Sequence, residues 1–179
     1  MTKSAQNDKK RRKKKRSAEK RNEMTKEEII QAVEAAIAQR GCFLVDVHLS
    51  ASNDIEIVIE KEDGTVDWDD CAAIDKVMHE RFNQDEEDYA LTVSSAGLDR
   101  PFKVLRQYLK AIGTPVEVKF KGGRRLVATL TSATEEAVGL QYSTLETVEG
   151  KKKKEKVEHT EICPLKEINS VRPFIEMIK

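Results

Sequence analysis

The hydrophobic pattern of this chain changes period at Pro115, and that change limits the folds open to it. Beyond this proline, apolar and polar residues alternate in short runs, which is typical of half-buried β-strands. A single helical turn is expected at residues 165–168, before a last run at residues 169–172. The alternating residues of the first four runs are Val116, Val118, Phe120, Leu126, Ala128, Leu130, Val138, Leu140, Tyr142, Val157, His159 and Ile162. The pattern therefore predicts five short strands, enough for a small β-barrel.

Residues 23–98 instead alternate between helical and strand patterns. Thr25 and Glu28 form a capping box, which predicts a helix that ends at Gly41. Apolar residues on one side of a strand, Phe43, Val45, Val47 and Leu49, are followed by a turn and a second strand at residues 55–60. Asp67 is expected to cap a second helix, and a third strand follows at residues 89–94. The buried stripe of the second helix is expected to consist of Trp68, Cys71, Ile74, Val77, Met78 and Phe82.

We therefore expect an α+β protein made of four segments. Residues 1–22 form a basic leader that is disordered when free, because it has too few apolar residues to offset the entropy of folding. Residues 23–98 form an α-β-β-α-β domain with a three-stranded sheet. Residues 99–113 hold a corner and a linking helix, and residues 114–179 form a five-stranded barrel of the SH3-like or Sm-like kind.

The net charge of zero hides a separation of charge along the chain. Residues 1–22 contain 11 Lys or Arg and 2 acidic residues, a net charge of +9, whereas residues 23–98 contain 5 and 19, a net charge of −14. Residues 99–179 contain 16 basic and 11 acidic residues, a net charge of +5. We therefore expect the acidic domain to meet a basic protein and the basic segments to meet nucleic acid.

One run is not explained by folding needs alone, and it follows the strand at residues 89–94. It reads Ser94-Ser95-Ala96-Gly97-Leu98-Asp99-Arg100-Pro101-Phe102. A glycine that can take a positive φ and an Asp-Arg pair ahead of a proline predict a rigid corner with outward-facing polar groups. The serine hydroxyls are expected to cap the turn and the linking helix. Asp99 and Arg100 could pair with each other, with the backbone, or with a binding partner.

This corner resembles the strand-end signature of the bacterial ribosome maturation factor RimP family, whose usual form reads Ser-Ser-Pro-Gly-Leu-Asp-Arg-Pro-Leu. Ala96 and Phe102 stand where the family has proline and leucine, so the corner is expected to be less rigid here. The order of expected elements from about residue 24 to residue 172 is also similar. The resemblance implies a C-terminal barrel of the same kind. It also implies docking on the free small (30S) ribosomal subunit near the basic ribosomal protein twelve.

The sequence does not support a catalytic site, a metal site or a cofactor site. Ser94 and Ser95 have no histidine in the flanking sequence and lack the Gly-x-Ser-x-Gly elbow of a serine nucleophile, so no enzyme is expected. Asp67, Asp69 and Asp70 lack the EF-hand spacing and suit the first turn of a helix instead. The chain has no Walker A loop and no dinucleotide fingerprint, and its three cysteines are far apart.

Basic clusters predict contacts with RNA, because a cation placed on a phosphate releases counterions. The RNA-binding candidates are Lys10, Arg11, Arg12, Lys13, Lys14, Lys15, Arg16, Lys119, Lys121, Arg124, Arg125, Lys151, Lys152, Lys153 and Lys154. The candidates for docking to a basic protein are Asp85, Glu86, Glu87 and Asp88. The ribosome-contact candidates are Ser94, Ser95, Gly97, Leu98, Asp99, Arg100 and Pro101.

We therefore expect a monomeric, cytoplasmic, non-catalytic assembly factor whose partners are ribosomal protein twelve and 16S ribosomal RNA. No membrane association is expected, since no stretch has the roughly 18 continuous apolar residues of a spanning helix. One alternative is a stand-alone RNA-binding module or RNA chaperone of the Sm-like type. A hydrolase centred on Ser94 or Ser95 is a third interpretation, which serine-directed covalent probes would test.

Overall fold

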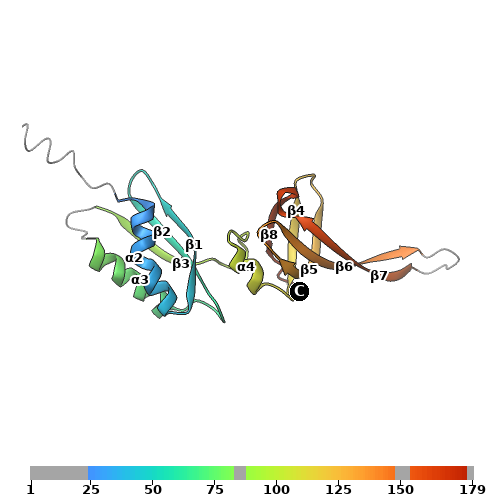
Figure 1. Ribbon diagram of the computed structural model, residues 1–179, viewed down its shortest axis with the longest axis horizontal. Coiled ribbons are helices and arrows are strands. Elements are labelled where there is room, and N and C mark those ends of the chain that lie inside the picture. Colours follow the sequence, from blue (N-terminus) through green and yellow to red (C-terminus); the bar gives the residue numbers. More distant parts are fainter. Residues whose placement is uncertain (1–23, 83–87, 148–153, 177–179) are drawn as a thin grey trace, which may run out of the picture.

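The computed structural model describes residues 24–82, 88–147 and 154–176 (Figure 1). The basic leader, residues 85–87 of the acidic run and residues 151–153 lie outside the described residues. The elements in chain order are α2 (Lys26–Gln39), β1 (Cys42–Leu49), β2 (Asp54–Lys61), α3 (Trp68–Arg81), β3 (Ala90–Ser95), α4 (Leu105–Lys110), β4 (Pro115–Phe120), β5 (Arg125–Ala133), β6 (Ala137–Thr147), β7 (Lys154–Pro164), the 3-10 turn η1 (Leu165–Glu167) and β8 (Ile168–Pro173). No helix in these ranges has both the length and the apolar character needed to cross a membrane.

The first five elements have the predicted α-β-β-α-β order and form a three-stranded sheet ordered β1-β2-β3. β1 and β2 pair antiparallel, as the hairpin prediction required, whereas β3 pairs parallel to β2. Capping boxes start both helices, Thr25 with Glu28 in α2 and Asp67 with Asp70 in α3. The two helices cover one face of the sheet (Figure 1). The centre of this core consists of Ile29, Val33, Val47, Ile55, Ile57, Ile59, Ile74 and Met78.

The opposite face of the same sheet also buries apolar side chains. Phe43 and Val45 of β1 pack there with Val58 of β2, in a cluster separate from the main core. The prediction that these two residues share one face with Val47 is therefore wrong, because Val47 packs beneath the helices. A register shift in the middle of β1 explains the difference, since one extra residue in a strand reverses the faces that follow.

Trp68 is the clearest failure of the predicted helical stripe. Its side chain is 83% exposed, although Ile74 and Met78 of the same stripe are fully buried. Trp68 is the first residue of α3. A helical side chain leans toward the N-terminus of its helix, so at this position it extends past the helix end and off the sheet.

The C-terminal elements form a five-stranded antiparallel sheet ordered β7-β6-β5-β4-β8. The predicted helical turn before the last strand is present as η1. Among the described residues no pairing joins β7 to β8, so the sheet is open and barrel closure of the SH3-like or Sm-like kind stays a prediction. Ile162 is 76% exposed and Cys163 is buried instead, so the predicted alternation of the fourth strand is wrong at its end.

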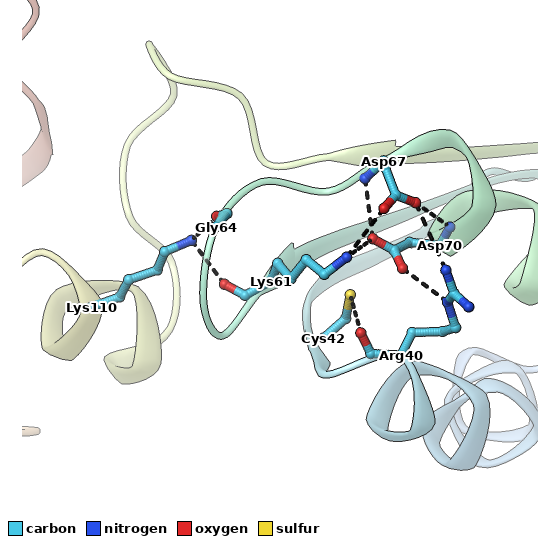
Figure 2. A network of polar contacts seen from close by, with 7 residues as sticks. All are labelled: Arg40, Cys42, Lys61, Gly64, Asp67, Asp70 and Lys110. Carbon is cyan, nitrogen blue, oxygen red and sulfur yellow. Dashed lines mark hydrogen bonds and ion pairs between the residues drawn. The ribbon is translucent and has the colours of Figure 1, made fainter.

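A buried carboxylate fixes the start of α3 (Figure 2). Asp70 is fully buried, and its carboxylate accepts hydrogen bonds from Lys61 Nζ at 2.7 Å and from Arg40 Nε at 2.9 Å. It also accepts one from the backbone N–H of Asp67 at 3.1 Å, which closes the capping box. Burial by itself would raise the pKa of Asp70, but these hydrogen bonds lower it to about 2.

Replacing this carboxylate should destabilise the protein in a pH-dependent way. We expect Asp70→Asn to lower the free energy of unfolding at pH 7 by about 3 kcal/mol, because two cations lose their shared anion. The folded-state pKa of Asp70 lies below its unfolded value, so its contribution is present above about pH 4 and is lost as pH falls toward 2. Urea denaturation at several pH values should show that the difference in free energy of unfolding between parent and variant becomes smaller as the pH falls over that range.

The matched control is Asp69→Asn, which removes the exposed neighbouring carboxylate from the same helical turn. If Asp70→Asn were no more destabilising than Asp69→Asn at pH 7, the buried network would not stabilise the fold as described.

Candidate functional site

The corner after β3 returns the chain across the second face of the N-terminal sheet. The backbone N–H of Ala96 donates to Ile59 O at 3.0 Å, which continues the parallel pairing for one more residue. The side chain of Ala96 is buried in the cluster that contains Phe43 and Val58. Gly97 then adopts a φ of +76°, the positive value that its sequence position predicted. A small buried residue, Ala96, and a glycine in the left-handed backbone conformation, Gly97, together make this turn.

The tip of the corner projects away from this apolar cluster. Leu98 is 69% exposed, and Asp99, Arg100 and Pro101 are exposed as well. Arg100 does not pair with Asp99; its guanidinium lies 3.4 Å from the Glu56 carboxylate of β2. The structure therefore brings four of the predicted ribosome-contact residues together on one exposed turn.

The two serines before the corner do not cap the linking helix, contrary to the prediction. The Ser94 hydroxyl is buried and forms no hydrogen bond with any described residue, while Ser95 is exposed. The Gln107 side chain caps the helix instead, since its Oε1 accepts the backbone N–H groups of Lys103 at 2.7 Å and Val104 at 3.4 Å. Sequence reasoning missed this role because the N-cap residue is Val104, which has no side-chain acceptor and so does not give the capping-box signature.

The linking helix α4 lies between the two sheets and contacts both (Figure 1). Val104 packs on the second face of the N-terminal sheet, and Gln107 Nε2 donates to Glu60 Oε2 of β2 at 2.8 Å. Tyr108 and Ala111 pack against the core of the C-terminal sheet. We name this set of contacts the interdomain joint, and it holds α4 against both halves of the chain.

Three ion pairs surround the interdomain joint. In each pair the cation comes from the linking segment, and the carboxylate comes from the N-terminal sheet or from the loop after β2. The pairs are Lys103 with Asp46, Arg106 with Glu62, and Lys110 with Glu60. Hydrogen bonding to Lys103 lowers the pKa of Asp46. Lys110 Nζ also donates to the carbonyl oxygens of Lys61 at 2.8 Å and Gly64 at 3.0 Å (Figure 2). The joint therefore combines apolar packing with charge complementarity.

In the C-terminal sheet, the cations at the β4–β5 turn differ in exposure and in ion pairing. Lys121, Arg124 and Arg125 are exposed and Lys119 is half-buried. Arg124 is held by Glu161 of β7, with its Nη2 atom 3.1 Å from Oε2, and its guanidinium lies over the Phe120 ring at 4.9 Å. The charge of Arg124 is therefore partly neutralised, which the sequence pattern did not indicate.

The structure separates two groups of cations that the sequence analysis treated together. Arg124 contacts β7 at Glu161, whereas Lys154 begins β7 seven residues earlier. At the rise of an antiparallel strand, those seven residues span about 24 Å. Residues 151–153 lie outside the described ranges, as do the leader candidates and three of the four acidic docking candidates; Asp88 is described and exposed.

Comparison with known proteins identifies the family. Residues 32–99 match the model of the RimP N-terminal domain. The ribosome maturation factor RimP of Flavobacterium psychrophilum is 31% identical over 137 residues, which cover 76% of this chain and 88% of that protein. The chain belongs to the RimP family. RimP proteins of Christiangramia forsetii and Porphyromonas gingivalis are each 30% identical, over 124 residues (69% of this chain, 80% of the relative) and 129 residues (72% and 84%).

The predicted resemblance to the RimP family is thus confirmed, and the corner that suggested it lies within the matched domain as far as Asp99. The interdomain joint connects Glu60, which lies within that match, to Gln107 of α4, which lies past its end. No sequence motif pointed to the joint, because it depends on residues far apart in the chain, such as Phe43 and Val104. The available signal was the spacing of cations by three or four residues along residues 100–110, which places them near one another on a helix.

Removing the Gln107 side chain should loosen the interdomain joint. We expect Gln107→Ala to lower the free energy of unfolding by about 1–2 kcal/mol, because the variant lacks a nearly buried amide that makes three hydrogen bonds. Small-angle X-ray scattering should then show a wider spread of distances between the two halves. Gln141→Ala, at an exposed site on β6, is the control and should change neither quantity. An unchanged distance distribution for Gln107→Ala would contradict this role.

Proposed function

We propose that this protein is a non-catalytic assembly factor that binds the free small (30S) ribosomal subunit in the cytoplasm and promotes its maturation. The observation that carries the proposal is its 31% identity to a ribosome maturation factor over 76% of the chain. The proposed partners are ribosomal protein twelve, which meets the acidic domain, and 16S ribosomal RNA, which meets the basic segments.

The charge distribution supports this division of partners. Residues 23–98 carry a net charge of −14, which opposes RNA phosphate and favours the surface of a basic protein. The leader carries +9 and residues 99–179 carry +5, and such cations attract phosphate through counterion release. In this proposal the C-terminal sheet acts as an SH3-like or Sm-like module that contacts RNA near the docked protein.

The interdomain joint supports a binding mechanism that needs no energy source. The linking segment contacts both halves of the molecule, so the three-stranded sheet and the C-terminal sheet are held next to each other. A factor of this kind promotes maturation when it binds one conformation of the immature subunit more tightly than the others, which raises the population of that conformation. Release follows when maturation changes the surface that is bound.

The surroundings of the corner serines support a non-catalytic role. The Ser94 hydroxyl has no hydrogen-bond partner among the described residues, so no base in that part of the chain is placed to activate it. Ser95 is exposed on the same strand. The corner therefore contributes contact surface in this proposal, through Leu98 and Arg100.

Removal of residues 1–22 tests the proposed RNA contact of the leader. The truncated chain should bind immature small subunits more weakly than the full chain at low salt, because it neutralises fewer phosphates. Affinity measured at several salt concentrations should show a shallower dependence, with the slope reduced by about 0.7–0.9 for each phosphate that the truncated chain leaves unneutralised. An equal slope for the two proteins would exclude the leader as a phosphate contact, while failure of the full chain to bind these subunits would refute the proposed function.

Arg100→Ala tests the proposed contact role of the corner. The ion pair with Glu56 is largely exposed, so the substitution should change the free energy of unfolding by less than about 1 kcal/mol. Binding to immature small subunits should nevertheless weaken by about fivefold or more, as expected for an arginine at an interface. Arg81→Ala, at an exposed arginine in the last turn of α3, is the matched control. If Arg100→Ala unfolds readily but binds normally when folded, the corner is structural only.

A further inference from the structure

Trp68 is the most exposed large apolar side chain in the described part of the protein, at 83%. It is also the single tryptophan of the chain. No cation lies over its ring among the described residues, whereas Phe43, Phe120 and Tyr142 each have an arginine there. Exposed tryptophans of this kind are unusual in a folded domain and are enriched at the centres of protein interfaces.

Trp68 lies between two residues that are held in place, Asp67 and Asp70, whose contacts Figure 2 shows. Asp67 and Asp70 flank it and cap the helix reciprocally, with Asp70 N–H donating to Asp67 Oδ1 at 2.9 Å. Lys61 and Arg40 fix Asp70 from β2 and from the end of α2. A large aromatic side chain on a rigid turn loses little conformational entropy when it is bound, so this position suits a binding anchor.

The loop before Trp68 is also fixed, and it is fixed by the interdomain joint. Lys110 of α4 donates to the carbonyl oxygen of Gly64, in the loop between β2 and α3 (Figure 2). Asp63 in that loop and Asp69 in the helix are both exposed, and neither forms an ion pair with a described residue. The loop before Trp68 and the residue after it therefore carry exposed carboxylates that are free to accept a cation.

The local charge balance identifies the kind of partner. Four aspartates lie within residues 63–70, whereas the basic residues that reach them are Arg40 and Lys61. The surface therefore keeps a net negative charge around an exposed indole ring. A guanidinium group stacks on an aromatic face and pairs with carboxylates at the same time, so arginine fits this combination better than lysine does.

We propose that Trp68, Asp63 and Asp69 form a docking surface for an arginine-rich segment of a partner protein. This inference rests on the proposed function, in which the acidic domain meets a basic protein. It places the contact at the start of α3, whereas the sequence analysis placed it at residues 85–88, beyond the other end of that helix. α3 itself spans 14 residues, about 21 Å, from Trp68 to Arg81.

The single tryptophan makes a direct test possible. The full chain is titrated with an octa-arginine peptide, and Trp68 fluorescence reports contact with the ring. The emission should be quenched at low salt and recover as salt is added. An octa-lysine peptide of equal charge should bind more weakly, because its ammonium groups do not stack. No change in emission at saturating octa-arginine peptide would overturn the proposal.

Variants establish which residues carry the binding, with affinity measured by the anisotropy of a labelled octa-arginine peptide. Trp68→Ala should weaken binding by about fivefold to tenfold, and Asp69→Asn should weaken it as well. The matched controls are Ile162→Ala, at a similarly exposed apolar residue of β7, and Glu135→Gln, at an exposed carboxylate between β5 and β6. Equal weakening in the controls would show general attraction of the peptide to the protein and overturn the proposal.

Two further measurements separate other occupants from a partner protein. If deletion of residues 1–22 shifts the Trp68 emission at low salt, the leader of this chain occupies the surface and the partner assignment is wrong. If a single-stranded oligouridylate quenches Trp68 as strongly as the octa-arginine peptide does, the surface binds nucleic acid and the proposal is again wrong. We expect neither effect, because in the proposed function the basic leader binds RNA phosphate and the negative surface around Trp68 repels it.

Assays with immature small subunits distinguish failure of this inference from failure of the proposed function. Trp68→Ala should bind these subunits about fivefold more weakly than the parent protein. Equal binding of parent and variant would remove the docking surface and leave the proposed function intact. If the parent protein does not bind the subunits but octa-arginine still quenches Trp68, the proposed function fails while the arginine-binding surface stands.

Discussion

The apolar cluster on the second face of the three-stranded sheet is the contact on which the arrangement of this protein depends. Phe43 and Val58 lie on a face that the two helices do not cover, so the chain itself must return to cover it. Ala96 and Val104 do so, and Gly97 makes the turn between them possible. A domain this small buries only about 60% of its unfolded surface, so this extra burial matters to its stability. The cover is also the link to the C-terminal sheet, and stability and domain arrangement therefore share one interface.

Ion pairs at this interface determine which carboxylates of the acidic domain stay unpaired. Lys103, Arg106 and Lys110 are paired with acids of the first sheet and the loop after β2, so the acidic domain is partly neutralised on the side that faces the linking helix. Among the described residues, Asp63 in that loop and Asp69 in α3 form no ion pair. The proposal that a basic partner docks near Trp68 follows from this distribution of unpaired carboxylates, which net charge alone does not give.

The same buried network that stabilises α3 also holds its exposed tryptophan in place. Asp70 has no solvent access and depends on Lys61 and Arg40 for compensation of its charge, which makes the first turn of the helix rigid. In the C-terminal sheet, Glu161 pairs with Arg124 and so partly neutralises the charge of this exposed guanidinium. In both cases a charge that the sequence leaves open is compensated within the fold.

The sequence by itself determined the order of helices and strands, the two capping boxes, the positive φ of Gly97 and the family, because these depend on neighbouring residues or on a short continuous motif. It did not determine the faces of β1 or the exposure of Trp68, because a bulge and a helix end interrupt the local period. The pairing of Arg100 with Glu56 and the hydrogen bond from Gln107 to Glu60 join segments far apart in sequence. Only the tertiary structure decided these contacts, because packing brings together groups whose separation along the chain carries no periodic signal.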